Sequence, residues 1–373
     1  METEVIKLSS DRLDIYKIRR AVDVVNAGGL AAFPTETVYG LACRVTNESL
    51  AKLSEVKGRD ADKYYTLHIG DKKRIDKYVP SRTLRENKLI AKAWPGPLTM
   101  IFDISDDDIS RLRKKLDRQE FENLYVRNSI GVRCPDNAVA AALLNEVPYA
   151  VVAPSANYSG AEPAVTAEQV SAVFDGTIEI ILDAGPTKYR SSSTIAKIGK
   201  NGVEILRNGY YNREQIIDFC TVNVLVVCTG NTCRSPMAEG LFKKVIAEKL
   251  SCSVDQLRQM GYKISSAGTI GVTGWPASSE AIAVCKAKSI DISGHSSSVL
   301  TEELIQQSDM IYAMGRSHLE QVKQLCPGGG DKCFLLAGDR EVPDPIGQDV
   351  EVYKKCFAMI EQSVAARISE LKL

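Results

Sequence analysis

The chain has 373 residues, and its 47 Lys and Arg residues balance 47 Asp and Glu residues to a formal net charge of zero. At roughly 100–200 residues per domain, this length indicates two domains. The 44% hydrophobic and 25% charged content are typical of a soluble globular protein, and the charge balance gives no indication of a nucleic-acid or membrane partner. No apolar run reaches the ~18 residues of a transmembrane helix, so no such helix is expected.

The first half of the chain alternates between helical and strand-like patterns, which predicts an α/β domain. Residues 12–27 place Ile15, Ile18, Val22 and Val25 on one helical stripe, and two glycines follow them. A second helix is expected at residues 49–56. Short strands are expected at residues 30–33, 66–69, 130–133, 149–153 and 178–182.

The segment 103–128 is densely charged with mixed signs. Composition favours a solvated helix or an insertion on the surface. A surface that grips an anionic partner is the alternative.

The second half begins at an apolar run, residues 222–227, which is typical of a strand covered on both faces in a parallel sheet. Residues 235–250 and 350–371 predict helices, and 310–314 and 333–336 predict strands. We therefore expect a first domain at 1–210, a linker at 211–221 and a second domain at 222–373.

The ten cysteines are scattered and do not have the spacing of a small disulfide-rich secreted scaffold. The N-terminus is polar and lacks the apolar core of a signal peptide. A cytoplasmic location with reduced thiols is expected.

A short loop, Cys228-Thr-Gly-Asn-Thr-Cys-Arg234-Ser235, joins the apolar strand at 222–227 to the following helix. Backbone N–H groups at the start of a helix bind a phosphate dianion, and the same field favours a thiolate. Cys228 is therefore expected to be a nucleophile, and the Arg234 guanidinium to hold the phosphoryl oxygens.

Other residues of this loop have expected supporting roles. Asn231 would brace the loop, and Ser235 would donate to the thiolate. Cys233 is either a packed thiol or a reversible disulfide partner of Cys228. Asp344, followed by Pro345 on a rigid loop, is suited to act as general acid and base.

Residues 222–373 resemble the low-molecular-weight protein tyrosine phosphatases along their whole length. The resemblance rests on CTGNTCRSPMAE, SSAGT at 265–269, GHSSSVLT at 294–301, the run ending at Met314, and Asp344-Pro345. It implies a phosphocysteine intermediate on Cys228, with phosphate bound by Arg234 and by the loop residues Thr229, Gly230, Asn231, Thr232, Cys233 and Ser235, and no cofactor.

Two features favour phosphoarginine over phosphotyrosine as the substrate. Thr232 stands where tyrosine-specific members usually have Ile, and Ile346-Gly347 follows Asp344-Pro345 in place of aromatic residues. This pattern resembles the bacterial protein arginine phosphatases, although Phe is expected at the position of Ile346. A protein tyrosine phosphatase is the alternative.

Polar motifs in the first half lie in loops at strand ends, which suggests a basic, hydroxyl-lined pocket for phosphates. They are PTETVYG at 34–40, Lys57-Gly-Arg59, WPGPLT at 94–99, PSANYSG at 154–160, Ser193-Thr194 and Arg207.

These motifs resemble the YrdC/Sua5 family of threonylcarbamoyl-AMP synthases over about residues 8–210. The resemblance implies that L-threonine, bicarbonate and ATP, with Mg²⁺ carried mainly on the phosphates, give threonylcarbamoyl-adenylate for tRNA modification. The implied binding residues are Thr35, Thr37, Tyr39, Lys57, Arg59, His68, Arg133, Ser155, Asn157, Ser193 and Arg207.

Asp60 replaces the usual proline of the Lys-x-Arg-Pro motif, and Tyr64-Tyr65 replaces a Pro-Leu pair. These departures bear on how the lid of the synthase site behaves and on the rate of the synthase reaction. The expected fold is a twisted mixed sheet followed by a three-layer domain with a parallel sheet of about four strands.

The expected partners are the small substrates, phosphorylated proteins, tRNA and tRNA-modification proteins, with no membrane partner and no bound metal. The alternative for the first half is a non-catalytic nucleotide- or RNA-binding module that regulates the phosphatase.

Overall fold

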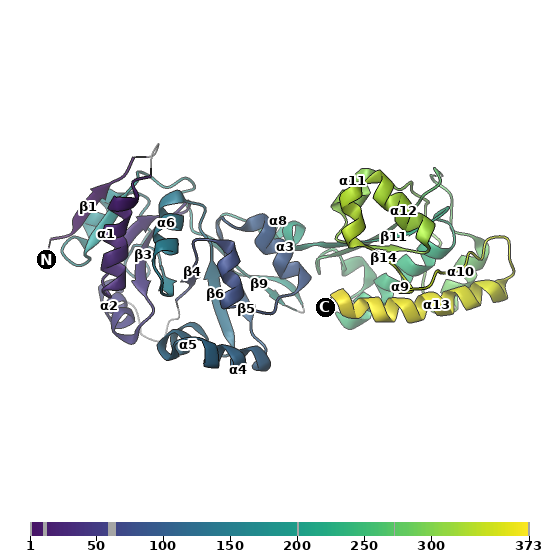
Figure 1. Cartoon of the computed structure of the whole chain (residues 1–373), viewed down its shortest axis with the longest axis horizontal. Coiled ribbons are helices and arrows are strands. Elements are labelled where there is room, and N and C mark those ends of the chain that lie inside the picture. Colours follow the sequence, from purple (N-terminus) through teal and green to yellow (C-terminus); the bar gives the residue numbers. More distant parts are fainter. Residues whose placement is uncertain (1, 10–12, 59–64, 200, 272, 372–373) are drawn as a thin grey trace. The chain divides into compact units, whose positions relative to one another are not determined.

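The structure, a computed structural model, describes residues 2–9, 13–58, 65–199, 201–271 and 273–371. The chain forms two compact units, of which the first ends at Phe219 and the second begins at Cys220 apart from two short earlier segments. Figure 1 shows the elements of each unit.

The first unit contains a mixed sheet with the strand order β1-β8-β2-β3-β7-β4-β6-β5-β9-β10 within the described residues. Neighbours β1/β8, β2/β8, β4/β6 and β5/β9 are parallel, and β2/β3, β3/β7, β4/β7 and β5/β6 are antiparallel. The strands are β1 (Glu4–Lys7), β2 (Ala31–Pro34), β3 (Tyr39–Arg44), β4 (Leu67–His68), β5 (Leu98–Asp103), β6 (Ser129–Arg133), β7 (Val151–Val152), β8 (Ile180–Asp183), β9 (Thr194–Gly199) and β10 (Gly202–Arg207).

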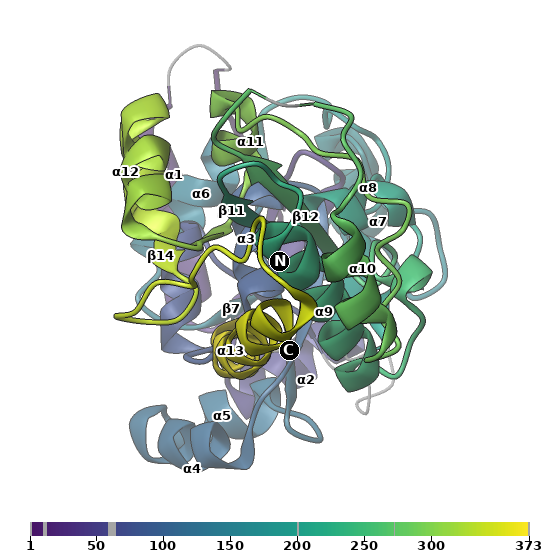
Figure 2. The same ribbon diagram turned by 90° about the vertical axis from the view of Figure 1, so that its right-hand side faces the viewer.

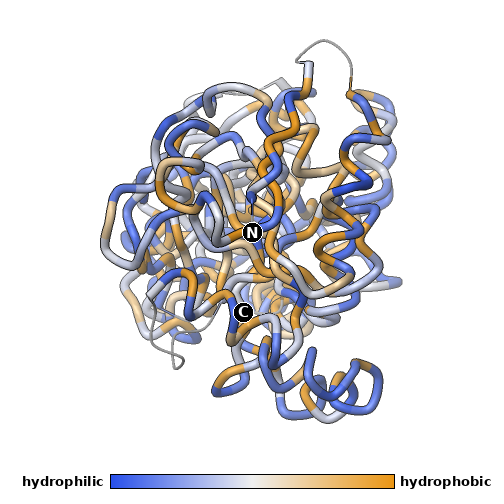
Figure 3. The backbone as a smooth tube through the Cα atoms, turned by 90° about the vertical axis from the view of Figure 1, so that its left-hand side faces the viewer, coloured by the Kyte–Doolittle hydropathy of each residue, from blue (hydrophilic) through white to orange (hydrophobic). Residues whose placement is uncertain are grey.

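Helices connect these strands, and the amphipathic pattern at the N-terminus forms as expected. Asp14 caps the first helix by accepting from the backbone N–H groups of Tyr16 and Lys17, and Ile18, Val22 and Val25 are buried. Figure 3 shows the alternation of apolar and polar residues along the outer helices. The helices are α1 (Ile15–Asn26), α2 (Asn47–Lys57), α3 (Leu84–Ala93), α4 (Asp106–Lys115), α5 (Arg118–Leu124), α6 (Ala138–Glu146), α7 (Ala167–Phe174) and α8 (Arg213–Cys220), with a 3₁₀ helix η1 (Lys72–Lys77).

The charged segment 103–128 is a pair of helices, α4 and α5, between strands β5 and β6. Three aspartates occupy the first turn of α4 and three basic residues its last turn, which complements the helix dipole. Ile109, Leu112 and Phe121 are buried beneath the charged face. The interpretation as a surface helix is therefore confirmed.

The second unit is built on a parallel sheet of four strands in the order β12-β11-β13-β14 within the described residues. Val222, Val224 and Val226 pack into one apolar cluster, and Leu225 and Val227 into another. Because both faces are covered, the strand is almost continuously apolar, with Asn223 as the exception, as the sequence predicts. The strands are β11 (Val222–Cys228), β12 (Tyr262–Gly268), β13 (Met310–Ala313) and β14 (Cys333–Leu335).

Helices cover both faces of this sheet. In Figures 1 and 2, α11 and α12 lie on one side and α9, α10 and α13 on the other. The helices are α9 (Arg234–Lys249), α10 (Ser279–Lys286), α11 (Glu302–Gln307), α12 (Arg316–Leu325) and α13 (Val350–Ile368), with 3₁₀ segments η2 (Val254–Gln256), η3 (Pro327–Lys332) and η4 (Ser369–Leu371). In the described part of the chain, no helix is both long enough and apolar enough to cross a membrane.

Candidate active sites

The loop between β11 and α9 places the Cys228 thiol at the start of a helix. Its Sγ lies 2.9 Å from the Ser235 hydroxyl oxygen, on the first turn of α9. Asn231 has a positive φ of 54°, a conformation that lets the chain reverse toward the helix. The structure therefore places the Cys228 thiol and the Ser235 hydroxyl together at the N-terminal end of α9.

Asn231 braces this loop from its centre. Its side-chain amide donates to the hydroxyls of Ser235 and Ser266, each at 2.8 Å, and its Oδ1 accepts the backbone N–H of Ser298 at 2.8 Å. Its backbone carbonyl lies 2.7 Å from His295 Nε2. The buried Asn231 side chain therefore links the loop to Ser266 and Ser298 on neighbouring segments.

Arg234 joins the loop to the expected acid. Its Nη2 pairs with Asp344 Oδ2 and also donates to the Thr229 hydroxyl at 3.0 Å. Its Nη1 donates to the Val342 carbonyl at 3.2 Å. The structure therefore brings Cys228, Arg234 and Asp344 to one place, although Asp344 is distant in sequence.

The ionisation of Cys228 is less favourable than the sequence suggests. Burial raises the pKa of the Cys228 thiol, and it outweighs the opposing hydrogen bond from Ser235 and the charge of Arg234. In the protein without a ligand, this raised pKa gives no support for the Cys228 thiolate that is expected from the sequence at neutral pH.

The other residues of the loop, Gly230, Thr232 and Cys233, contact one another and the side chains of Ser278 and Tyr353. The Cys233 thiol lies 3.2 Å from the Tyr353 hydroxyl oxygen and also contacts Ser278. The Thr232 hydroxyl is 3.6 Å from the Cys233 sulfur. The Cβ that a side chain at Gly230 would carry lies within 3.5 Å of the Thr232 hydroxyl. Both cysteines are free thiols in the structure.

Sequence reasoning missed one residue of this site. His318 is buried and its Nε2 lies 2.9 Å from the Thr229 hydroxyl oxygen. Its only signal in the sequence was that it is one of three histidines.

The first unit contains a polar cavity of about 190 Å³ at the ends of its central strands. Among the predicted binding residues, those that line it are Thr35, Tyr39, His68, Arg133, Ser155, Ser193 and Arg207. The lining contains two arginines and several hydroxyl groups, and the described lining residues include no carboxylate. This composition suits an anionic ligand.

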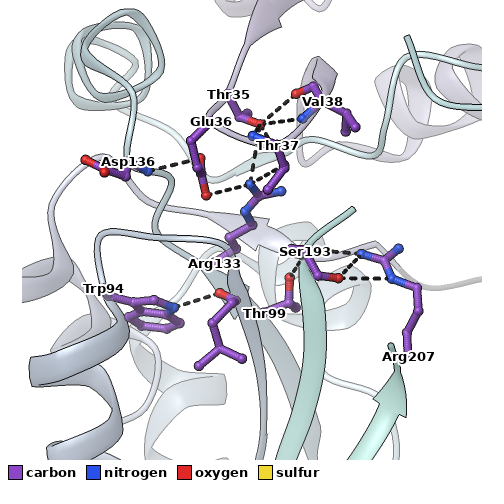
Figure 4. Close-up of polar contacts among 11 residues, drawn as sticks. Thr35, Glu36, Thr37, Val38, Trp94, Thr99, Arg133, Asp136, Ser193 and Arg207 are labelled. Atoms are coloured by element: carbon purple, nitrogen blue, oxygen red, sulfur yellow. Dashed lines mark hydrogen bonds and ion pairs between the residues drawn. The ribbon is translucent and has the colours of Figure 1, made fainter. Parts of the chain in front are cut away.

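Arg133, at the end of β6, is held by the turn between β2 and β3. Its Nη2 pairs with Glu36 Oε1 at 2.9 Å and donates to the Thr37 hydroxyl at 2.7 Å (Figure 4). Glu36 also accepts the backbone N–H of Asp136 at 3.1 Å. The Arg133 Nε is buried without a hydrogen-bond partner, so this guanidinium has a donor left for a ligand.

Arg207 and Ser193 form a second polar group at the cavity. Arg207 donates to the Ser193 carbonyl and hydroxyl, and the Ser193 hydroxyl lies 3.2 Å from that of Thr99 (Figure 4). Burial, and then the charge of Arg133, lower the pKa of Arg207. Two nearby guanidinium groups create a positive field that phosphate groups would neutralise.

Three predicted residues lie behind the cavity and do not line it. The buried Lys57 ammonium donates to the backbone carbonyls of Ser155 and Asn157, and the Asn157 amide donates to the Tyr158 and Ala161 carbonyls. The Thr37 hydroxyl accepts a hydrogen bond from Arg133. Arg59 lies outside the described residues.

His68 is a neutral base facing the cavity. Its Nδ1 lies 3.0 Å from the Thr66 carbonyl, so Nδ1 carries the proton and Nε2 is free to accept one. Burial, with a smaller effect of Arg133, lowers the pKa of His68 from 6.5 to about 3.

This low pKa predicts how stability depends on pH. Below pH 6.5 the unfolded chain binds a proton at His68 that the folded chain does not, so stability falls as the pH falls toward 3. Between pH 7.5 and 5.5 the loss from this group is about 1.4 kcal/mol. Urea unfolding measured through Trp94, in a Trp275→Phe background, checks it. The loss should disappear in His68→Gln; an equal pH dependence in that variant would contradict the assignment.

Comparisons with known proteins agree with this division into two sites. A family model named Sua5/YciO/YrdC and described as telomere recombination matches residues 23–209, and the low molecular weight phosphotyrosine protein phosphatase model matches residues 223–373. A Bacillus subtilis threonylcarbamoyl-AMP synthase is 33% identical over 54% of this chain and 55% of its own length. An Escherichia coli low molecular weight protein-tyrosine-phosphatase, Etp, is 32% identical over 38% of this chain and 88% of its own length.

The solved structure of Pyrococcus abyssi Sua5 with L-threonine covers 97% of this chain and 98% of its own, at 20% identity and a TM-score of 0.52. At this identity the likeness supports the fold alone. The chain spans about half the length of the Bacillus and Pyrococcus synthases.

The fold and the two sites define an α/β protein with a mixed-sheet unit that holds a basic, hydroxyl-lined cavity and a parallel-sheet unit that holds a cysteine-containing loop at a helix start. The chain belongs to the Sua5/YciO/YrdC family through its N-terminal half and to the low molecular weight phosphotyrosine protein phosphatase family through its C-terminal part.

Proposed function

We propose that this chain is a bifunctional enzyme, with residues 1–210 and 222–373 as its catalytic domains and 211–221, which include all of α8, as their linker. The first domain forms threonylcarbamoyl-adenylate from L-threonine, bicarbonate and ATP. The second hydrolyses phosphorylated side chains of proteins. Ten free cysteines are consistent with a reducing cytoplasm.

The cavity carries the proposal for the synthase. Arg133 and Arg207 would bind the phosphates of ATP, whose negative charge increases at the α-phosphate during adenylation. His68, with Nε2 free, would accept a hydrogen bond from the threonine amine or its carbamate. Because the described lining has no carboxylate, Mg²⁺ would be held by ATP oxygens.

Lys57 has a supporting role in this proposal, because its ammonium holds the Ser155 and Asn157 backbone. The product would serve tRNA modification, with tRNA and its modification proteins as downstream partners. Formation of the adenylate and pyrophosphate by the full chain, dependent on all three substrates, tests the proposal. Nucleotide binding without turnover by folded protein would support a regulatory module.

The arrangement of Cys228, Arg234 and Asp344 carries the proposal for the phosphatase. Cys228 would attack the phosphorus and form a phosphocysteine while Asp344 protonates the leaving group. Water activated by Asp344 would then release phosphate. On substrate binding the Cys228 thiol would give its proton to an oxygen of the phosphoryl dianion, while the Ser235 hydroxyl and the charge of Arg234 stabilise the thiolate, and Asp344 in its protonated form supplies the separate proton of the leaving group.

Phosphoarginine is the substrate we favour. Beside the acid, Ile346 is 63% exposed and Gly347 has an open surrounding with φ +74°, so no aromatic pair encloses a phenol ring there. The Asp344 carboxylate would pair with a departing guanidine as it does with Arg234. Phosphotyrosine is the second candidate, since the relatives are named tyrosine phosphatases.

Thr232→Ile should shift the substrate preference toward phosphotyrosine by ~10-fold, because a larger apolar side chain favours a flat aromatic ring. The measurement is the ratio of kcat/KM for paired peptides that carry phosphoarginine or phosphotyrosine. Thr229→Ser serves as a control at the same loop. An unchanged ratio, or a wild-type chain that prefers phosphotyrosine, would contradict the arginine assignment.

A further inference from the structure

His318 is linked to the phosphate-binding arginine through a single hydroxyl group. It lies on α12, and its Nε2 is 2.9 Å from Thr229 Oγ1. The same oxygen accepts from Arg234 Nη2 at 3.0 Å. A continuous chain of hydrogen bonds therefore runs from Arg234 through Thr229 to the imidazole.

The direction of these bonds follows from the donor inventory. A guanidinium only donates, so Thr229 Oγ1 accepts from Arg234 and has its own hydrogen to give. We assign that hydrogen to His318 Nε2, which is then the unprotonated nitrogen. The proton of the neutral imidazole is then on Nδ1, which is buried, has no hydrogen-bond partner in the described residues and faces the Gly315 backbone.

The charges around His318 favour the neutral ring. Burial, followed by Arg234 on α9, lowers the pKa of His318. Asp344 and Glu341, in the loop after β14, and the Gly315 carbonyl at the start of α12 oppose this with smaller effects. The neutral ring at physiological pH agrees with the acceptor role of Nε2.

Arg234 needs an anchor that remains when substrate binds. Its Nη2 pairs with Asp344, but Asp344 must be available to protonate the leaving group, and the phosphoryl oxygens compete for the same guanidinium. The bonds to the Val342 carbonyl and to Thr229 do not involve the acid.

We propose that His318 is a positioning residue of the phosphatase site, which orients the Thr229 hydroxyl so that it holds Arg234 in the phosphoryl-binding position throughout the reaction. This inference rests on the proposed phosphatase function. Protonation of His318 would turn Nε2 into a donor, so that the Thr229 hydrogen would lose its acceptor and a second positive charge would lie near Arg234. The grip on Arg234 then weakens on the acid side of the pH profile.

Kinetics of the full chain test the proposal. His318→Leu removes the acceptor and should raise both KM and the inhibition constant of inorganic phosphate by ~10-fold, the size expected for one lost hydrogen bond to a charged network. His318→Asn offers an amide oxygen to Thr229. It should recover most of the affinity and remove the contribution of the histidine to the acid limb of the pH profile.

A double-variant comparison separates positioning from general structural damage. Because His318 acts through Thr229, Thr229→Val combined with His318→Leu should bind phosphate no more weakly than Thr229→Val alone. Additive losses, or unchanged KM and phosphate inhibition in His318→Leu, would overturn the proposal. Synthase activity and thermal unfolding of the same chains report folding.

The imidazole tautomer gives a readout independent of activity. In ¹⁵N NMR of the full chain, whose three histidines are assigned by single variants, Nδ1 of His318 should carry the proton at pH 7. A proton on Nε2 would overturn the inference. If the wild-type chain lacked phosphatase activity, the proposed function would fail. The role of His318 would still be decided by two measurements, the tautomer of its imidazole and the affinity for inorganic phosphate.

Discussion

Replacing Cys228 with serine is expected to lower phosphatase turnover by ~10⁴-fold or more, the loss typical of a removed nucleophile. A serine hydroxyl at this position does not ionise, and the neighbouring Ser235 and Arg234 cannot supply the missing charge. Synthase turnover in the same chain should stay unchanged, because the cavity residues belong to the other unit.

The matched control is Cys252→Ser, a partly exposed free cysteine of the same unit. It should leave both activities unaltered. Initial rates of both reactions, measured on the same preparations, provide the comparison. Substantial phosphatase turnover in Cys228→Ser would mean that the hydrolysis does not use this thiol.

Arg133→Met is expected to have the largest effect on the synthase. It leaves the Glu36 carboxylate, whose side chain is 1% exposed, without its cation, and it removes a guanidinium from the cavity. Loss of one partner from a buried ion pair costs about 3–5 kcal/mol of unfolding free energy. Adenylate formation should fall by ~100-fold or more, because a charged phosphate contact is lost.

The double variant Glu36→Gln, Arg133→Met distinguishes stability from activity. It should recover much of the unfolding free energy but none of the turnover, which calorimetry and pyrophosphate release measure separately. Arg118→Met is the control for an exposed pair, with Arg118 87% exposed beside Glu122, and should leave the unfolding free energy almost unchanged. Recovery of turnover in the double variant would show that Arg133 acts through stability alone.

The phosphate loop could be predicted from sequence because its chemistry is local. One strand, one turn and one helix start place Cys228, Arg234 and Ser235 together, and these residues are adjacent in the chain. Asp344 came from the resemblance and from its rigid Asp-Pro loop. His318 could not be found, because only the packing of α12 beside the loop brings it to Thr229.

Strands with polar or very short sequences were also difficult to predict from the sequence. Residues 262–268 form β12 although Lys263, Ser265 and Ser266 interrupt the apolar pattern, because pairing with β11 decides the conformation. Tyr39 and Gly40, at the end of the motif 34–40 that was interpreted as a turn, begin strand β3, which pairs with β2 and β7. Lys57 matches a nucleotide-binding motif, yet its ammonium bonds to backbone carbonyls, a contact that spacing does not reveal.

The central claim is that two chemically unrelated activities reside in one chain. The most direct test assays purified full-length protein for threonylcarbamoyl-adenylate from L-threonine, bicarbonate and ATP, and for phosphate release from phosphoarginine peptides. Both products should form, and Cys228→Ser should abolish only the second. A folded chain that made no adenylate, or that released no phosphate from phosphoarginine or phosphotyrosine peptides, would contradict the claim.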